Sequence, residues 1–199
     1  MRELQVIGAG GHATVVIALL KALKYPVVSI IDTPRFAQEI IMEIPIVTQP
    51  LATAAVVIAM GDNQRRQAAF LQWQDQLLVD NLYHPKAYID DTAKLGVANQ
   101  ILAFAMVGPA AALGNGNILN TQAVVEHQVE VGHFNHIAPG AKLLGKVKVG
   151  DRCFIGANAV VRDGISICSD VVVGANSYVA ADINSPGVYV GTPARRIKA

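Results

Sequence analysis

The sequence predicts a small parallel α/β domain over residues 1–84, followed by a parallel β-helix of about five coils over residues 85–199. Two observations support this prediction. From Ile89 to Val179 every sixth residue is Ile, Leu or Val, with no slipped register, and a chain that lays one short strand on each flat side of a prism produces such a period. Residues 4–31 instead show a strand, a glycine-rich turn, a helical run and a second strand, which is the order of a βαβ unit.

Composition narrows the class of protein. The chain has 199 residues, a formal charge of +1 and 52% hydrophobic residues, which is ample for a core. Without a basic run, we expect neither nucleic acid nor a membrane as a main partner. The chain opens directly into a predicted strand and not into a secretory signal, so we expect it in the cytoplasm. Cys153 and Cys168 fit neither a disulfide nor a zinc pattern, and we expect small, buried thiols and no metal.

The glycine-rich turn is the first candidate for binding. Residues 4–7 form a predicted strand, Gly8 to Ala13 a turn that fits G-x-G-x-x-A, and residues 14–23 a helix, while the second strand over 27–31 ends in Asp32. Such a unit binds nucleotides, because amides at the helix N-terminus face a phosphate and an acid follows the second strand. Glycine turns also join strands to helices for structural reasons alone, so both interpretations stay open here.

The rest of the first domain completes about half of a Rossmann fold. We predict a third strand over 54–60, a helix that runs from the loop G-D-N-Q-R-R to about Gln76, and a fourth strand over 77–82. Pro85 marks the join to the β-helix. A half-site of this size suits a mononucleotide or a nucleotide sugar better than a dinucleotide.

The hexads predict how the β-helix is built. The sixth-residue aliphatic positions should point inward, and the fifth position of each hexad, for example Ala105, Ala123 and Cys153, should supply a second, small inward side chain. The residue after the aliphatic one is often glycine, as at 96, 108, 114, 132, 150, 156 and 174, where we expect a corner with positive φ. Three hexads make one coil, so residues eighteen apart should stack, in a prism roughly 25 Å tall.

Histidine is the candidate for chemistry on the prism, because acyl transfer to an amine or hydroxyl needs a base near neutral pH. The five histidines are at positions 12, 84, 127, 133 and 136. His127 occupies the third, outward position of its hexad, and its stacking neighbour is Gly145, so a notch should lie beside it. The alternative is a solvated surface histidine.

The motifs together resemble one family along the whole chain: G-A-G-G-H, I-I-D, M-G-D-N-Q-R-R, H-P-K-A, N-T-Q-A-V-V-E-H, H-I-A-P-G-A and V-G-T-P-A-R-R. The resemblance is to the left-handed β-helix acyltransferases, and among them to the bacterial nucleotide-aminosugar N-acetyltransferases and the related sialic acid O-acetyltransferases of surface-glycan synthesis. It implies a left-handed β-helix, acetyl-CoA as co-substrate, a nucleotide-sugar substrate and a homotrimer.

The resemblance also implies a mechanism. The residue that matches His127 is the catalytic base, which takes a proton while the sugar amine or hydroxyl attacks the acetyl-CoA carbonyl directly. In the aminosugar enzymes a carboxylate follows the base and orients it, whereas this chain has Gln128, which cannot stabilise an imidazolium by charge. Three alternatives follow: Glu126 or Glu130 takes that role, the histidine works as a weaker base, or activity is reduced or lost.

For the coenzyme, the resemblance assigns His136 as donor to the thioester oxygen. Nine residues separate it from His127, which is half a coil, so we expect the site to form where prisms of a trimer meet. The small residues Gly145, Ala157 and Ala175 share the third hexad position and are candidates to line the pantetheine arm, although corner packing explains them equally well.

For the nucleotide sugar, the resemblance places the phosphates over Gly10, Gly11 and His12, with Asp32 near the base or ribose. Asn63 and Arg66 are expected to hold the sugar side or the phosphates. Relatives often carry two acids where this chain has Asp32 and Thr33, which leaves the nucleotide base open.

Three hypotheses about function remain at this point. The first is N-acetylation of a nucleotide-linked 4-amino sugar, and the second is O-acetylation of sialic acid or a related sugar. The third is a non-catalytic trimeric binding or scaffold protein, which should bind no acetyl-CoA. A zinc enzyme would need His127, His133 and His136 as ligands, and their spacing gives that idea little support.

Overall fold

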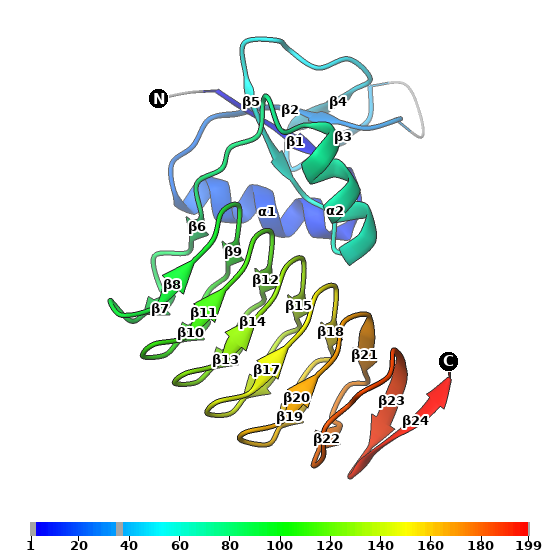
Figure 1. Cartoon of the computed structure of the whole chain (residues 1–199). Helices are drawn as coiled ribbons and strands as arrows, with labels where there is room; N and C mark the ends of the chain where they lie inside the picture. The colour runs from blue at the N-terminus through cyan, green and yellow to red at the C-terminus, as the bar shows by residue number, and fades with distance from the viewer. Residues whose placement is uncertain (1–2, 35–37, 199) are drawn as a thin grey trace.

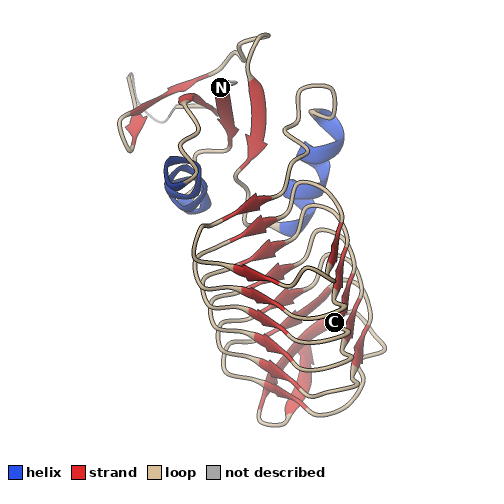
Figure 2. Ribbon diagram, turned by 90° about the vertical axis from the view of Figure 1, so that its left-hand side faces the viewer, coloured by secondary structure: helices blue, strands red, loops and turns tan. Residues whose placement is uncertain are grey.

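The computed structural model describes residues 3–34 and 38–198. Figure 1 shows an N-terminal sheet above a long β-helix, and α1 (Gly11–Ala22) and α2 (Asn63–Gln72) pack on opposite faces of that sheet (Figure 2). Within the described ranges, no helix is long and apolar enough to cross a membrane.

The N-terminal sheet has the order β3-β4-β2-β1-β5. Its strands are β1 (Leu4–Ile7), β2 (Val27–Ile31), β3 (Ile40–Ile41), β4 (Ile44–Val47) and β5 (Ala55–Ile58), of which β3 alone runs antiparallel to its neighbour. The predicted bounds of β1 and β2 are confirmed. The buried face of α1, with Val16, Ile17 and Leu20, packs on this sheet, and Asp62 caps α2 by accepting a hydrogen bond from the Arg65 amide at 2.8 Å.

The predicted fourth strand over residues 77–82 is wrong. Leu77 makes only an isolated bridge to Val56, and the next strand, β6 (Leu82–Tyr83), pairs with β9 of the β-helix. The chain therefore leaves the N-terminal sheet before residue 82. The hairpin of β3 and β4 was not predicted.

In the part of the chain that the structure describes, the remaining strands stack into three sheets, the faces of a prism (Figures 1 and 2), in which every pair is parallel except β23 with β24. The first face contains β7 (Tyr88–Ile89), β10 (Met106–Val107), β13 (Val124–Val125), β16 (Lys142–Leu143), β19 (Val160–Val161) and β22 (Tyr178–Val179). The second face contains β8 (Lys94–Leu95), β11 (Ala112–Leu113), β14 (Glu130–Val131), β17 (Lys148–Val149) and β20 (Ser166–Ile167). The third face contains β6, β9 (Gln100–Ile101), β12 (Ile118–Leu119), β15 (His136–Ile137), β18 (Phe154–Ile155), β21 (Val171–Val173), β23 (Gly187–Gly191) and β24 (Ala194–Lys198).

The hexad pattern determines the core of the β-helix. Residues eighteen apart pair in register, as Val125 does with Leu143 and Leu143 with Val161. From Ile101 onward the aliphatic residue of each hexad is buried, and Ala105, Ala123 and Cys153 supply the second inward position. The predicted β-helix of about five coils is therefore confirmed.

The prediction that the glycines after the aliphatic residues have positive φ is wrong. Positive φ recurs every six residues from 98 to 176, but at the fourth position of the hexad, on residues as different as Phe104, Lys146 and Asp170. The glycines after the aliphatic residues serve close packing of the coils. A Cβ on Gly156, for example, would lie 2.6 Å from the Ala175 amide nitrogen of the next coil.

One corner of the core is polar, which was not predicted from the sequence. At the corner between the second and third faces, Asn81, Asn99, Asn117 and Asn135 stack eighteen residues apart. The Oδ1 atoms of Asn99 and Asn117 accept hydrogen bonds from the next asparagine's amide at 2.8 Å, and Oδ1 of Asn135 accepts one from the Cys153 amide at 2.7 Å. Asn99, Asn117 and Asn135 are completely buried, so this ladder satisfies polar groups that would otherwise destabilise the core.

Candidate functional site

The glycine-rich turn forms one wall of an open cleft of about 330 Å³, and the structure brings Gly10, Gly11, His12 and Asp32 together there. Gly10 and Gly11 are exposed, and a Cβ on either would meet nothing within 4 Å. Because α1 begins at Gly11, the first amides of the helix have no partner in the preceding turn of helix and carry the positive end of its dipole. This end of the cleft suits an anionic group such as a phosphate.

The side chain of Asp32 stabilises the glycine-rich turn. Its Oδ2 accepts a hydrogen bond from the Ala9 amide at 2.7 Å, and its Oδ1 accepts one from the Thr33 amide at 2.7 Å. The carboxylate is nevertheless exposed at the cleft, so these contacts hold the turn in shape while leaving the remaining lone pairs accessible.

His12 is held in one tautomer. Gln100 donates through Nε2 to the Ile58 carbonyl at 2.6 Å, which directs its Oε1 to His12 Nε2, 2.9 Å away. His12 Nε2 therefore carries the proton, and Nδ1 is an acceptor. Burial, together with nearby Arg66, lowers the pKa of His12 although the Gln100 bond opposes this shift. The neutral side chain offers no charge to a phosphate, so the expected phosphate contact of His12 is left to its backbone.

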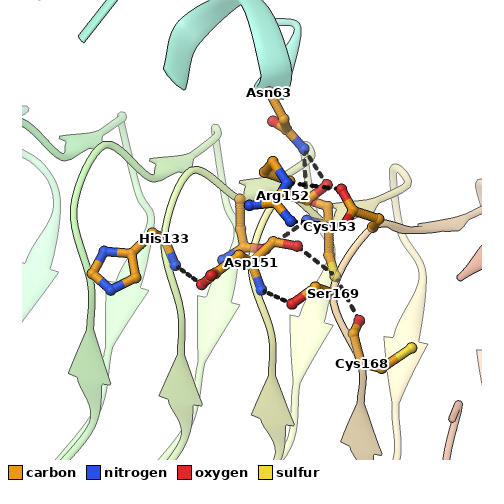
Figure 3. A network of polar contacts seen from close by, with 9 residues as sticks. Asn63, His133, Asp151, Arg152, Cys153, Cys168 and Ser169 are labelled. Atoms are coloured by element: carbon orange, nitrogen blue, oxygen red, sulfur yellow. Dashed lines mark hydrogen bonds and ion pairs between the residues drawn. The ribbon is translucent and has the colours of Figure 1, made fainter. Parts of the chain in front are cut away.

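Asn63 and Arg66, which are expected to hold the substrate, have side chains that bind the β-helix. Every nitrogen of the buried Arg66 guanidinium donates hydrogen bonds, at 2.6 to 3.1 Å, to the Asn63 side chain and to the carbonyls of Met60, Gly61, Gly116, Phe134 and Asn135. Asn63 donates to the carbonyls of Arg152 and Cys153 (Figure 3). These side chains fasten α2 to three successive coils of the β-helix. Burial lowers the pKa of Arg66 to about 9, which still leaves it charged at neutral pH.

His136, the expected donor to a thioester, is also an interface residue, and in this chain both of its ring nitrogens have partners. Its Nδ1 lies 3.3 Å from the Gly61 carbonyl oxygen, and its Nε2 lies 3.0 Å from the Asn120 amide nitrogen. Nδ1 therefore carries the proton, and Nε2 accepts from Asn120. Burial, reinforced by Arg66, lowers the pKa of His136 to about 4, so the ring is neutral and has no free N–H.

A second cleft, of about 400 Å³, continues the first across the third face. The two share Gly61 and Asp62, and the second is lined by Phe154 and by Arg152, whose guanidinium forms a bidentate ion pair with Asp170 at 2.7 and 2.8 Å. A ligand with an anionic group at the glycine turn can thus extend along the β-helix.

The corner beside this cleft carries a second ladder, which explains His133. His133 Nδ1 accepts a hydrogen bond from the Asn115 amide at 3.0 Å, Asp151 accepts one from the His133 amide at 2.7 Å, and Ser169 accepts one from the Asp151 amide at 2.9 Å (Figure 3). His133 is therefore a stacking residue. Burial raises the pKa of the adjacent Cys153 thiol to about 12, as expected for an unreactive core cysteine.

His127 lies elsewhere, on the corner between the first and second faces. Its side chain is exposed, and no described residue forms a hydrogen bond or ion pair with its ring, neither Glu126 nor Gln128. A Cβ on Gly145 would lie 2.5 Å from both Cε1 and Nε2 of His127. The notch expected beside His127 is thus filled by its own imidazole, whose Cε1–Nε2 edge lies over the glycine.

The structure separates the predicted site residues into two groups. The glycine-turn cleft faces the third face through Gln100 and His136, whereas His127 and Gly145 lie at the opposite corner, after strands of the first face. Ala157 and Ala175 stack with each other after β18 and β21, at the corner between the third and first faces. Gly145 and the two alanines therefore do not line one groove within a single chain.

A zinc site is not supported. Across residues 3–34 and 38–198, no group of three or more His, Cys, Asp or Glu side chains could hold a metal ion. His127 follows β13 and His133 follows β14, whereas His136 lies in β15. The three histidines are therefore on different sides of the prism.

Two family models match parts of the chain: the PglD N-terminal domain over residues 3–72 and the hexapeptide repeat of succinyl-transferase over residues 146–181. A search of the curated proteins found no match.

Solved structures match along the whole length. The acetyltransferase domain of PglB from Neisseria gonorrhoeae, in complex with acetyl coenzyme A, is 30% identical, with 98% of this chain and 99% of that chain covered and a TM-score of 0.90. A variant of perosamine N-acetyltransferase from Caulobacter crescentus, in complex with CoA and GDP-perosamine, is 30% identical, with 100% and 98% covered and a TM-score of 0.93. WeeI from Acinetobacter baumannii, at 22% identity, 99% and 100% coverage and a TM-score of 0.88, shares the fold.

Proposed function

This chain belongs to the left-handed β-helix family of nucleotide-sugar acetyltransferases, and from this membership we propose that it transfers the acetyl group of acetyl-CoA to the amino group of a nucleotide-linked 4-amino sugar. The observation that carries the proposal is the whole-length similarity, at 30% identity, to an N-acetyltransferase bound to CoA and a nucleotide-linked sugar. The open glycine turn supports it, since the first amides of α1 suit the diphosphate of such a substrate.

His127 acts as the general base. Its ring is exposed and free of hydrogen bonds within the described chain, so one ring nitrogen can take the proton that the amine loses as it attacks the thioester carbonyl. The attack is direct, because Cys153 is buried and its thiol pKa is raised to about 12, which makes it unsuitable as an acyl carrier.

The active site forms between chains of a homotrimer. In one chain the glycine-turn cleft adjoins the third face, while His127 lies on the corner between the first and second faces. A threefold arrangement of prisms can bring the His127 corner of one chain to the third face of the next. This arrangement also accounts for Ala157 and Ala175, which lie at a different corner from Gly145 and would line a coenzyme groove from the neighbouring chain.

The substrate chemistry favours the cytoplasm and a role in bacterial surface-glycan synthesis, where acetyl-CoA and nucleotide sugars are both consumed. N-acetylation is preferred to O-acetylation of sialic acid because the nucleotide-type turn is retained beside the β-helix and leads into a second cleft along the third face.

A thiol-release assay tests the proposal. Purified protein is incubated with acetyl-CoA and a panel of UDP-, GDP- and dTDP-linked 4-amino sugars, with free sialic acid as the O-acetylation acceptor. We expect turnover with one amino sugar, and a loss of roughly 10²- to 10⁴-fold in His127→Ala, the range that a general base contributes.

Two controls accompany this assay. His84→Ala removes a histidine outside both groups of site residues and should retain activity. Size-exclusion chromatography should give the same oligomer for the wild type and for His127→Ala, because an exposed side chain carries no core volume. Turnover with sialic acid alone, or full activity in His127→Ala, would contradict the proposal.

A further inference from the structure

The corner that carries His127 places a carboxylate on the far side of Gly145. His127, Gly145 and Asp163 each follow the aliphatic residue of their hexad by two positions, and those aliphatic residues pair in register through β13, β16 and β19. The three residues therefore stack on successive coils at one corner, with a glycine in the middle.

The imidazole already spans the first of these steps. Because Cε1 and Nε2 of His127 lie 2.5 Å from the position of a Cβ on residue 145, the far edge of the ring is level with the coil of Gly145. The next coil, which carries Asp163, is only one strand spacing further, about 4.8 Å. A charge-assisted hydrogen bond needs about 2.8 Å between its heavy atoms, and a rotamer of the Asp163 side chain can span the remaining distance.

Asp163 is free to make this contact. It is exposed, and no residue in the described ranges forms a hydrogen bond or ion pair with its carboxylate. At the neighbouring corner, side chains in the same hexad position reach back to the amide of the preceding coil, as Asn115 does to Val97, His133 to Asn115 and Asp151 to His133. A side chain in this hexad position can therefore reach the preceding coil, and for Asp163 that coil carries Gly145 and the edge of the His127 ring.

We propose that Asp163 is the positioning residue for His127: its carboxylate accepts the N–H of the imidazole and leaves the other ring nitrogen as the acceptor. The carboxylate also stabilises the imidazolium that forms when the base takes a proton. Asp163 thereby supplies the charge that Gln128 cannot. The catalytic meaning of this pair depends on the function proposed above, whereas the pair itself does not.

The test measures the pKa of His127 directly. Histidine labelled with ¹³C in the full chain gives five ring signals, and His127→Gln identifies the one that belongs to His127. We expect Asp163→Asn to lower the pKa of His127 by about half a unit or more, because a nearby carboxylate favours the charged ring and solvent screens the effect. An unchanged His127 pKa in Asp163→Asn would overturn the proposal.

Other charges at this corner require a control. They are Glu126 on the coil of His127, Lys142 and Lys146 on the coil of Gly145, and Arg162 beside Asp163. Glu126→Gln removes the alternative acid, and a larger shift of the His127 pKa in Glu126→Gln than in Asp163→Asn would assign the role to Glu126 instead.

Kinetics add a readout that a structural role would not change. With an accepted amino sugar, Asp163→Asn should lower kcat by roughly tenfold, a part of the contribution of the base, and move the acidic limb of the pH profile to lower pH, with KM for acetyl-CoA unchanged. Gln128→Glu in the Asp163→Asn background should restore both. If the wild type turns over no acceptor, the proposed function fails, while the titration still decides whether Asp163 and His127 pair.

Discussion

Replacing Gly145 with alanine tests whether the observed position of the His127 ring is the working one. The new Cβ would lie 2.5 Å from Cε1 and Nε2 and 3.3 Å from Cδ2 of the ring. Contacting carbon atoms stay about 3.5 Å apart, so the ring must move by about 1 Å or more. We expect Gly145→Ala to lose most of the roughly 10²- to 10⁴-fold contribution of a general base.

Stability should change little in the same variant. The backbone of Gly145 is not in the left-handed region, so alanine is tolerated there and even restricts the unfolded chain, worth about 0.4–1 kcal/mol. The atoms that must move are the end of an exposed side chain with no hydrogen bonds in the described structure, and a strained rotamer costs about 0.5–1.5 kcal/mol. These effects nearly cancel, so the expected shift in Tm is within about 4 °C for a chain of this size.

The assay compares kcat, KM for acetyl-CoA and Tm in Gly145→Ala and in a matched variant, Gly164→Ala. Gly164 has a φ of +69°, and a Cβ on it would meet nothing within 4 Å. Gly164→Ala should therefore lose about 1–2 kcal/mol of stability through backbone strain and keep its kcat, the reverse of Gly145→Ala.

A double variant separates two explanations. If Gly145→Ala acts only by displacing the ring, it should have no further effect on kcat in the His127→Ala background, because the two changes remove the same contribution. Wild-type kcat in Gly145→Ala, or a further loss in the double variant, would refute the reasoning. The second result would mean that the added methyl blocks a ligand and not the base.

Other contacts give further expectations. Arg66→Met should destabilise the protein by at least about 3 kcal/mol in urea denaturation, because buried carbonyls lose their donor, whereas Arg65→Met on the exposed side of α2 should change stability by less than about 0.5 kcal/mol. Asn117→Ala interrupts the buried ladder and should cost about 2–4 kcal/mol, with the exposed Asn184→Ala as its control. Burial lowers the pKa of His136 from 6.5 to about 4, so the folded state binds fewer protons than the unfolded state between these values. Its contribution, on the order of 3 kcal/mol, is fully present above pH 6.5 and is lost as the pH falls towards 4. Urea midpoints at pH 7.5 and 5 should show this slope, and His136→Asn should reduce it.

The fold was largely predictable because apolar residues recur at the period of the β-helix. Inward positions tolerate only aliphatic or small side chains, so the hexad pattern gives the coil without reference to anything else. The corner positions with positive φ could not be predicted in this way. Their positive φ falls on Ala, Phe, Gln, Lys, Arg, Asn and Asp as well as Gly, so no residue type marks the position. The hairpin of β3 and β4 was missed for a similar reason, since its turn residues Met42 and Glu43 have φ of 52° and 72° without the usual Asn or Gly.

The contacts of the candidate site residues could not be predicted from the sequence. Motif matching selected Asn63, Arg66 and His136, yet each of them binds main-chain groups across the interface between the N-terminal domain and the β-helix. Whether a polar side chain meets a ligand or a carbonyl depends on which residue lies opposite, and across this interface that residue is 50 to 90 positions away in the sequence. His127 differs because the stacking rule of the β-helix itself identifies its neighbours, Gly145 and Asp163.

Successive coils of a β-helix are alike, so the N-terminal domain could dock at several positions along the prism. The buried polar contacts select one of these positions. Carbonyls recur on every coil, so the hydrogen bonds from Arg66 and Asn63 alone would be nearly as good after a slip of one coil, about 4.8 Å. Gln100 and His136 are not repeated, since the intervening and following outward positions of the third face are Ile118, Phe154 and Val172. Gln100 bonds His12 and Ile58, and His136 bonds Gly61, so a slip would deprive these polar groups of their partners, at about 1–3 kcal/mol for each buried group left unpaired. The register of the domain, and with it the position of the glycine-turn cleft along the prism, is therefore specified by the side chains of Gln100 and His136.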